Sequence, residues 1–295
     1  MIRTLITTCT AVLVAFPCLA QQRFDSPEDA AKAVIDAAHD HDPALLLKVL
    51  GPEAKPILSS GNPEKDRAEQ DEFVRLATAK HRIQISSIDP GRAILVIGDE
   101  DWPFPVPIVR TKGKWSFDAS VAPTEMQARR IGADELDAIE ICHGYADAQR
   151  TYASQDHDKD GMLEYAPRLM SQPGHQDGLY WNGASPAPLV PESFAQAEWA
   201  GQVKGNAKPY HGYYFRVLDR QGPNAPGGAH NYLVHNKLIG GVGLVAWPAE
   251  YGVTGIHTFI VNQEGIVYEK DISPVPGKPV PVTTYDPDNT WQPVD

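Results

Sequence analysis

The sequence predicts an α+β protein of two units, each with helices first and an antiparallel sheet after them. Three helix starts precede residue 80, and beyond it apolar residues alternate as they do in strands. A second helical pattern near residues 134–155 is followed, from residue 212, by segments rich in β-branched and aromatic residues. A chain of 295 residues is long enough for two cores. We expect a first domain at residues 24–120, a second at 124–272 and a proline-rich tail at 273–295.

Residues 1–20 have the pattern of a cleaved export signal. Arg3 provides a positive charge, residues 5–16 are predominantly apolar, and the small residues Cys18 and Ala20 occupy the positions that signal peptidase requires. The apolar stretch is too short to span a membrane. We expect cleavage at about residue 20 and a mature protein that is periplasmic or secreted.

The composition argues against several classes of function. The formal net charge is −12, whereas a nucleic-acid partner requires a basic face, so none is expected. No later apolar run is long enough to cross a bilayer, which predicts no transmembrane segment in the mature chain. Cleavage would remove Cys9 and Cys18 and leave Cys142 alone, so we expect a buried free thiol and no internal disulfide.

The predicted helices of the first domain share one start signal, a capping residue followed by proline. Backbone N–H groups of the first turn have no acceptor within the helix, so proline, which has no N–H, loses nothing there. The side chain of the preceding residue accepts hydrogen bonds from the N–H groups that follow the proline. The three pairs are Ser26–Pro27, Asp42–Pro43 and Asn62–Pro63. Extended segments follow at residues 83–85, 93–97, 106–109 and 115–117, with Lys112 and Gly113 as a hairpin turn between the last two.

This order of helices and strands resembles the cone of cystatin-like and nuclear-transport-factor-like proteins, in which a curved sheet wraps a helix. Such cones hold either a small-molecule site or a packed core, so the resemblance does not choose a function. A deep cavity in residues 24–118 with paired titratable groups would favour an exported hydrolase or isomerase. A cavity filled by Trp115, Phe117 and leucines would favour a scaffold.

The second domain begins with the longest predicted helix, at residues 134–155. Its apolar residues recur at intervals of three and four, and Asp134, Glu135 and Asp137 lie in its first turn, where the helix dipole favours acids. Residues 167–210 form an irregular segment with one short helix at residues 192–199. Strands are predicted at residues 213–218, 230–234, 238–247, 256–261 and 266–270.

A long helix, an irregular insert and an antiparallel meander resemble the globular domain of pilins and pseudopilins. The resemblance is carried by Gly-Tyr-Tyr-Phe at residues 212–215, Trp-Pro-Ala at 247–249, and the segments 255–259 and 262–267. In a pilin the long helix begins as an apolar membrane segment. Here its start is acidic, so we do not expect assembly into a pilus.

Five further motifs, spread over nearly the whole mature chain, resemble one exported bacterial family. They are Asp-Trp-Pro-Phe-Pro at residues 101–105, Gly-Lys-Trp at 113–115, Arg-Arg-Ile-Gly at 129–132, Gly-Leu-Tyr-Trp at 178–181 and Ala-Trp-Pro-Ala-Glu-Tyr-Gly at 246–252. Together they are similar to the family called domain of unknown function 2950. The resemblance implies an exported protein and supplies no catalytic residues.

An acidic loop where the long helix ends is the sharpest candidate site. Asp156, Asp158 and Asp160 alternate, a glycine follows for the tight bend, and Glu164 lies within reach, as in the first half of a calcium loop. Pro167 stands where an EF-hand has its closing glutamate, so a complete EF-hand is not expected. Two interpretations stay open, a structural Ca²⁺ site and a solvated turn that binds nothing.

Aromatic residues suggest a second candidate site. Tyr180, Trp181, Trp247 and Tyr251 could line a groove between the irregular insert and the sheet, although core packing would explain the same residues. The Gly-x-Ser-x-Gly elbow, His-x-x-x-His and Cys-x-x-Cys are all absent, and no residue is assigned a catalytic role.

The sequence therefore favours an exported, non-catalytic envelope protein that binds another envelope protein and carries a structural calcium loop. The alternative is a small-molecule enzyme, a hydrolase or an isomerase, that uses a cavity in the cone-like domain.

Overall fold

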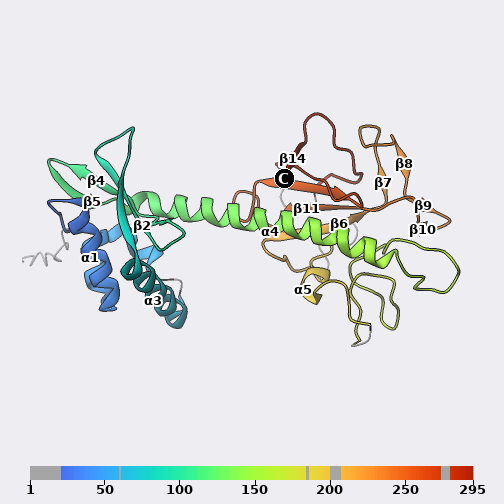
Figure 1. Ribbon diagram of the computed structural model, residues 1–295, viewed down its shortest axis with the longest axis horizontal. Helices are drawn as coiled ribbons and strands as arrows, with labels where there is room; N and C mark the ends of the chain where they lie inside the picture. The colour runs from blue at the N-terminus through green and yellow to red at the C-terminus, as the bar shows by residue number, and fades with distance from the viewer. Residues whose placement is uncertain (1–20, 60, 184–185, 200–206, 274–279, 295) are drawn as a thin grey trace, which may run out of the picture. The chain divides into compact units, whose positions relative to one another are not determined.

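The computed structural model describes residues 21–59, 61–183, 186–199, 207–273 and 280–294. The predicted export signal, residues 1–20, lies outside the described residues. Helices and antiparallel sheets are both present, which confirms the α+β class (Figure 1). The chain forms two compact units, Met1–Met126 and Gln127–Asp295.

Each helix of the first unit begins where the sequence predicts. The Ser26 hydroxyl accepts the N–H of Asp29 at 3.1 Å, and Asp42 and Asn62 cap the next two helices in the same way. These helices end before residue 81, where the alternating pattern starts. They are α1 (Pro27–His39), α2 (Pro43–Leu50), the 3-10 helix η1 (Pro52–Ile57) and α3 (Pro63–Ala79).

The sheet of the first unit is antiparallel, with β2 at its centre. β1 pairs with one edge of β2, and β3 and β4 share the other edge. Lys112 and Gly113 both have positive φ, as the predicted β4–β5 hairpin turn requires. The two-residue strand β3 was not predicted from the sequence. The strands are β1 (His81–Ile85), β2 (Arg92–Ile97), β3 (Trp102–Pro103), β4 (Ile108–Thr111) and β5 (Lys114–Phe117).

The long helix α4 (Ala122–Tyr152) begins twelve residues earlier than predicted, after a 3-10 turn η2 (Ala119–Val121). The predicted start, Asp134, rests on acidic first-turn residues and an apolar face. Residues 123–133 contribute no buried side chain, so an apolar pattern could not reveal them. They contain good helix formers, and proline at position 123 is tolerated in a first turn.

The sheet of the second unit is an antiparallel meander whose spatial order is β14-β13-β12-β11-β6. The predicted strand 213–218 is confirmed to the residue. The predicted strand 238–247 is instead two strands, which are separated at Gly241, where φ is +141° and a Cβ would lie 2.6 Å from the ring of Tyr232. The main strands are β6 (Tyr213–Leu218), β11 (Gly243–Pro248), β12 (His257–Asn262), β13 (Val267–Asp271) and β14 (Gln292–Val294).

Alternate residues of this sheet enter two different cores. On one face, which we call the helix-side core, Phe215, Leu244 and Phe259 pack against Cys142 and Tyr145 of α4. The other face, which we call the strap-side core, is built from Trp199, Tyr214, Val245, Trp247, Ile260 and Tyr285. The sheet is therefore covered on both faces.

The proline-rich end, in its described part 280–294, is a strap across the second face of the sheet. Val280 and Tyr285 are buried there, and the Arg216 side chain donates hydrogen bonds to the carbonyls of Val280 and Val282. The strap ends as β14, which extends the sheet beside β13. Lys270 lies over the ring of Trp291, 5.6 Å from its centroid.

The irregular insert of the second unit contains only one helical turn among its described residues, α5 (Glu192–Ala195), shorter than the predicted helix 192–199. Two small hairpins follow β6. They consist of β7 (Arg220–Gln221) with β8 (His230–Asn231), and β9 (Leu233–Val234) with β10 (Lys237–Leu238). In the part of the chain described here, no helix combines the length and apolar character that a membrane crossing needs.

Candidate functional site

The acidic loop folds so that its three aspartates converge. Asp156 accepts the backbone N–H groups of Lys159, at 2.7 Å, and Gly161, at 2.8 Å. Gly161 has a φ of +88°, the left-handed conformation that glycine adopts at little cost. One carboxylate oxygen from each of Asp156, Asp158 and Asp160 lies within 4.8 Å of the others. The spacing that the sequence predicts for a cation site is therefore present.

Lys237, at the start of β10, places its ammonium group among these carboxylates. Its Nζ lies 2.5 Å from Asp158 Oδ2, 2.7 Å from Asp160 Oδ2 and 3.4 Å from Glu164 Oε1. The Lys237 side chain is only 17% exposed. Three of the four predicted metal ligands thus contact a cation that belongs to the protein itself.

The charges of the loop stabilise this arrangement. The ammonium group donates hydrogen bonds to Asp158, which has the largest effect, and to Asp160. These bonds hold the pKa of Lys237 above its usual range. The N–H groups of Gly161 and Lys159 lower the pKa of Asp156, chiefly through Gly161. Ca²⁺ takes six to eight oxygen ligands, so it would need the carboxylate oxygens that Lys237 now contacts. An ion bound among these carboxylates would therefore have to displace the ammonium group.

The four aromatic residues predicted to line a groove are not brought together. Tyr180 packs at the edge of the helix-side core, whereas Trp247 lies in the strap-side core on the opposite face of the sheet. Trp181 is buried and donates its indole N–H to the Pro186 carbonyl at 2.9 Å. Tyr251 is 37% exposed. Of these four residues, only Trp247 lies on β11, where neighbouring side chains point to different faces of the sheet and place this one in the strap-side core.

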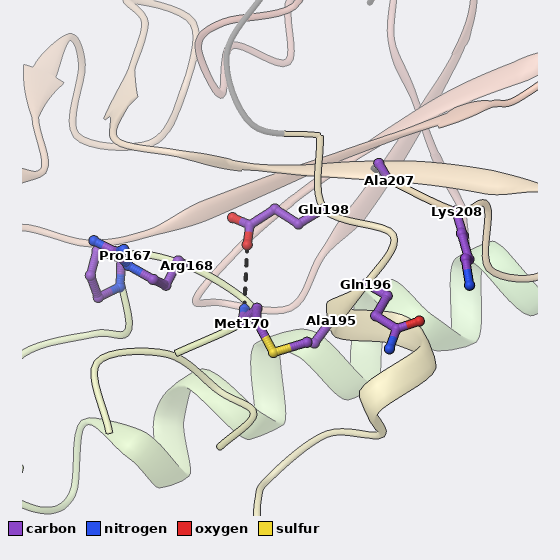
Figure 2. A pocket seen from close by; sticks show the side chains of 8 residues that line it. All are labelled: Pro167, Arg168, Met170, Ala195, Gln196, Glu198, Ala207 and Lys208. Carbon is purple, nitrogen blue, oxygen red and sulfur yellow. Dashed lines mark hydrogen bonds between the residues drawn. The ribbon is translucent and has the colours of Figure 1, made fainter. Parts of the chain in front are cut away.

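A pocket of about 670 Å³ opens in the second unit, lined by side chains from residues 167–170, 195–198 and 207–208 (Figure 2). Glu198 lies in its wall, and its Oε2 accepts the backbone N–H groups of Leu169, at 2.8 Å, and Met170, at 3.4 Å. Burial raises the pKa of this carboxyl group. Glu198 thus connects two segments that are 28 residues apart.

A further acidic group on α4 also serves to hold segments together. Glu135 Oε1 accepts the backbone N–H groups of Ile256, at 2.8 Å, and His257, at 2.9 Å, and lies 3.1 Å from His257 Nδ1. Asp137 Oδ2 lies 2.5 Å from Nδ1 of His211. These contacts attach the start of β12 and the turn before β6 to the helix.

Cys142 is fully buried and unpaired, as predicted. Burial raises the pKa of its thiol to about 12. Because the thiolate is the reactive form, this cysteine is a packing residue of the helix-side core.

Buried side chains of the first unit form a hydrophobic core. Trp115 and Phe117 of β5 are buried together with Leu95 and Ile108 from the neighbouring strands, and Leu50 of α2 joins them. Trp115 and Phe117, the two residues whose burial the sequence analysis linked to a scaffold, thus belong to this hydrophobic core.

Sequence reasoning missed the two residues that organise these sites. Lys237 is 73 residues from Glu164, and nothing in its local pattern points to the loop. A weak signal is the His235–Asn236 turn, whose two positive φ angles reverse the chain and present Lys237 to the loop. Glu198 gave no signal, because its role depends on backbone N–H groups of a distant segment.

The fold and these sites define a two-unit α+β protein whose acidic clusters are tied into the structure. A family model described as protein of unknown function (DUF2950) matches residues 21–294. The chain belongs to this family, in agreement with the motifs that predicted it. No curated protein and no solved structure is significantly similar to the chain, and the resemblance to pilin domains is not confirmed.

Proposed function

We propose that this chain is an exported, non-catalytic protein of the bacterial cell envelope whose second unit binds another envelope protein beside the acidic loop. One observation carries the proposal, namely that exposed apolar side chains flank a loop fixed by Lys237. Leu163 is 56% exposed, and Val234 and Ile239 are 38% and 39% exposed. The loop and the β9–β10 hairpin are joined by the hydrogen bond from Tyr165 N–H to the Leu238 carbonyl, 2.9 Å long.

The charge of this surface favours a basic partner. The four carboxylates of the loop outnumber the nearby cations Lys159 and Lys237, and the protein as a whole carries a net charge of −12. Electrostatic complementarity would guide a basic surface towards it and would set the orientation of binding. Apolar side chains at the centre of the contact would supply affinity.

Export is proposed from the sequence pattern of residues 1–20. The fold is compatible with a cone-like first unit and a pilin-like second unit, in which α4 packs on a meander sheet. The burial of Trp115 and Phe117 in the hydrophobic core of the first unit supports a scaffold in preference to a small-molecule enzyme.

Calcium is proposed as a competing occupant of the acidic loop. The three converging aspartates offer hard oxygen ligands, and the ammonium group of Lys237 lies beside them. In this proposal the role of Ca²⁺ is structural, because the ion takes over from the Lys237 ammonium group the task of holding the loop carboxylates together.

Site-directed photo-crosslinking in cells tests the proposed partner surface. A photo-reactive phenylalanine analogue at Leu163 or Val234 should yield one discrete envelope adduct, which Leu163→Asp with the analogue at Val234 should abolish. The matched control is Ile88 in the first unit, which is 95% exposed and should give no such adduct. Adducts of the same kind at Ile88, no adduct at either test position, or recovery of the protein only from cytoplasm would contradict the proposal.

A further inference from the structure

Three of the four outer strands of the two five-stranded sheets are protected against pairing with another chain. Beside β5, Phe24 donates its N–H to the Trp115 carbonyl at 2.8 Å and accepts the Trp115 N–H at 2.9 Å. Beside β6, Phe215 accepts the N–H of Trp199 at 2.7 Å and donates its own to Ala197 at 3.1 Å. The third, β14, is only three residues long and contains a proline, two features that discourage pairing at an edge.

The remaining outer strand, β1, pairs with β2 along one edge and is open along the other. The Ser86 N–H donates to the Arg92 carbonyl, and the Lys80 carbonyl accepts the Gly98 N–H, both at 2.9 Å. Even-numbered residues therefore direct their backbone groups towards β2, and the alternate ones direct theirs outward. The outward-facing residues are His81, Ile83 and Ile85. In the described part of the chain, nothing hydrogen-bonds to their backbone groups.

The side chains of β1 are also poorly covered, since four of its five residues are exposed. Ile83 packs at the border of the first unit's core, but Ile85 on the same face is 54% exposed. On the other face, Arg82 Nη1 donates to Gln84 Oε1 at 3.0 Å, and Arg82 Nη2 lies 3.4 Å from Asp101 Oδ2. An apolar residue thus lies beside an unpaired backbone edge.

From these observations we propose that β1 pairs with β1 of a second copy of this chain. The two strands run antiparallel, with Ile83 on the two-fold axis, so that His81 of each copy lies opposite Ile85 of the other. These outward-facing residues exchange backbone hydrogen bonds, and Ile85 becomes covered. This surface lies in the first unit and does not depend on the proposed partner surface of the second.

The charges of β1 favour a second copy in this register. Arg82 lies opposite Gln84 of the other copy, and Lys80 opposite Ser86, so no like charges face each other directly. The neighbouring register that keeps the hydrogen bonds would place Arg82 opposite Arg82 of the other copy, which is unfavourable. A shift in the opposite direction leaves His81 without a partner in the strand. The strand is therefore complementary to itself in one register.

Disulfide trapping in the purified protein tests this register. Residues 82 and 84 of different copies would form a non-hydrogen-bonded pair, with Cα atoms about 4.5 Å apart, within reach of a disulfide. Arg82→Cys mixed with Gln84→Cys should give a linked dimer under mild oxidation, and neither variant should do so alone. As a control, Lys65→Cys, at an exposed position of α3, should not link to Gln84→Cys. The buried thiol of Cys142 should not react.

Two further substitutions at Gln84 separate strand pairing from a general effect of net charge. Gln84→Glu places an acid opposite Arg82 of the other copy and should strengthen the dimer by about threefold to tenfold, whereas Gln84→Arg should weaken it by a similar factor. The net charge of −12 predicts the opposite order, because added negative charge increases repulsion between copies. Sedimentation equilibrium measures each dissociation constant, which we expect on the order of 0.1 mM for so short a contact.

A proline in the open edge provides an independent test. The Ile85 N–H points outward, so Ile85→Pro keeps the pairing with β2 and should abolish the dimer, whereas Ile85→Val should dimerise as the wild type does. Thermal unfolding verifies that each variant is folded. A self-adduct at Ile88 in the crosslinking experiment above would have the mass of two copies, which distinguishes it from an envelope adduct.

Three results would overturn the proposal. One is a wild type that stays monomeric at about 1 mM, which would leave the edge of β1 to a strand of another protein. Another is linkage of the single cysteine variants as rapid as that of their mixture. The third is a pair of Gln84 variants whose dissociation constants follow the net charge.

Discussion

Lys237 determines what the acidic loop can bind. A row of alternating aspartates suggests a divalent cation when it is considered alone, because carboxylate oxygens are the ligands that Ca²⁺ prefers. In the folded protein an ammonium group lies 2.5 Å and 2.7 Å from two of these carboxylates. Ion pairs within the protein thus hold the loop, and any Ca²⁺ must compete with a tethered cation.

Replacing this lysine should convert the loop into a better Ca²⁺ site. We expect Lys237→Met to bind Ca²⁺ at least about tenfold more tightly than the wild type, because it removes a unit positive charge from contact distance. Calorimetric titration measures the affinity, and thermal unfolding should show stabilisation by Ca²⁺ that a chelator reverses. Lys159→Met also removes one positive charge from the loop, but this charge does not contact the carboxylates. The Ca²⁺ affinity of this variant should therefore stay near that of the wild type. Equal affinities for the two variants would refute the competition.

Glu198 should tolerate an amide but not an aliphatic side chain. Glu198→Gln keeps an acceptor for Leu169 and Met170 and should remain within about 1 kcal/mol of the wild type in free energy of unfolding. Glu198→Leu leaves two buried N–H groups without a partner and should lose about 2–4 kcal/mol. Denaturant unfolding measures both.

The same carboxyl group predicts a pH dependence. Burial raises the pKa of Glu198 in the folded protein, so the folded state favours the protonated form. Its contribution to stability is therefore greatest below the unfolded pKa and is lost as the pH rises through the folded pKa. The wild type should lose stability relative to Glu198→Gln as the pH rises through the range above the ordinary glutamate pKa of about 4.3. A constant difference over that range would show that Glu198 is not strained by burial.

Helices and strands that are determined by residues within the same segment were predictable from the sequence. Those that depend on pairing with a distant segment were not. The starts of α1, α2 and α3 follow from a capping side chain and a proline, which act within one turn. Strand β6 follows from its own run of aromatic and β-branched residues. By contrast, β14 contains Pro293 and has no strand pattern, and only its pairing with β13 makes it a strand.

The strap is the element whose attachment depends most on one side chain. Arg216 donates to two strap carbonyls from the strap-side core, and its guanidinium also lies over the Trp247 ring, 5.6 Å from the centroid. We expect Arg216→Ala to increase hydrogen exchange and proteolysis at residues 280–291 by about tenfold, as loss of roughly 1–2 kcal/mol of charged hydrogen bonding implies.

The neighbouring Arg220 offers a matched control for this experiment. Its side chain is exposed and pairs with the adjacent Asp219, so Arg220→Ala should leave the strap protected. Equal exchange in both variants would mean that apolar packing of Val280 and Tyr285, and not Arg216, holds the strap.

At the scale of the whole molecule, two separate sets of buried residues should unfold separately. Leu95 lies in the core of the first unit and Leu244 in the helix-side core, and both are fully buried. Each substitution to alanine should cost about 2–5 kcal/mol and lower the midpoint of one calorimetric transition only. The double variant should show both shifts, added independently. One shared transition, lowered by either substitution, would show that the units unfold as one.

The fold class and the family were accessible from the sequence because they depend on patterns spread over the whole chain. The sites were accessible only in part. The aspartates of the loop are close in sequence, so their convergence could be predicted, but Lys237 and Glu198 act on segments that the fold brings to them. Trp247 shows the opposite limit, because aromatic composition alone does not tell which face of a sheet a side chain enters.

The strand order of the second sheet has a consequence for how this protein comes into being. From β11 to β14 every strand of that sheet lies beside the one that precedes it in the meander, so each of them meets a partner that has already been made. A polypeptide that emerges amino end first, from a ribosome or a translocation pore, can lay down this sheet in order of arrival. Each new strand covers the edge left by the strand before it, which shortens the time for which that edge is open to wrong pairing.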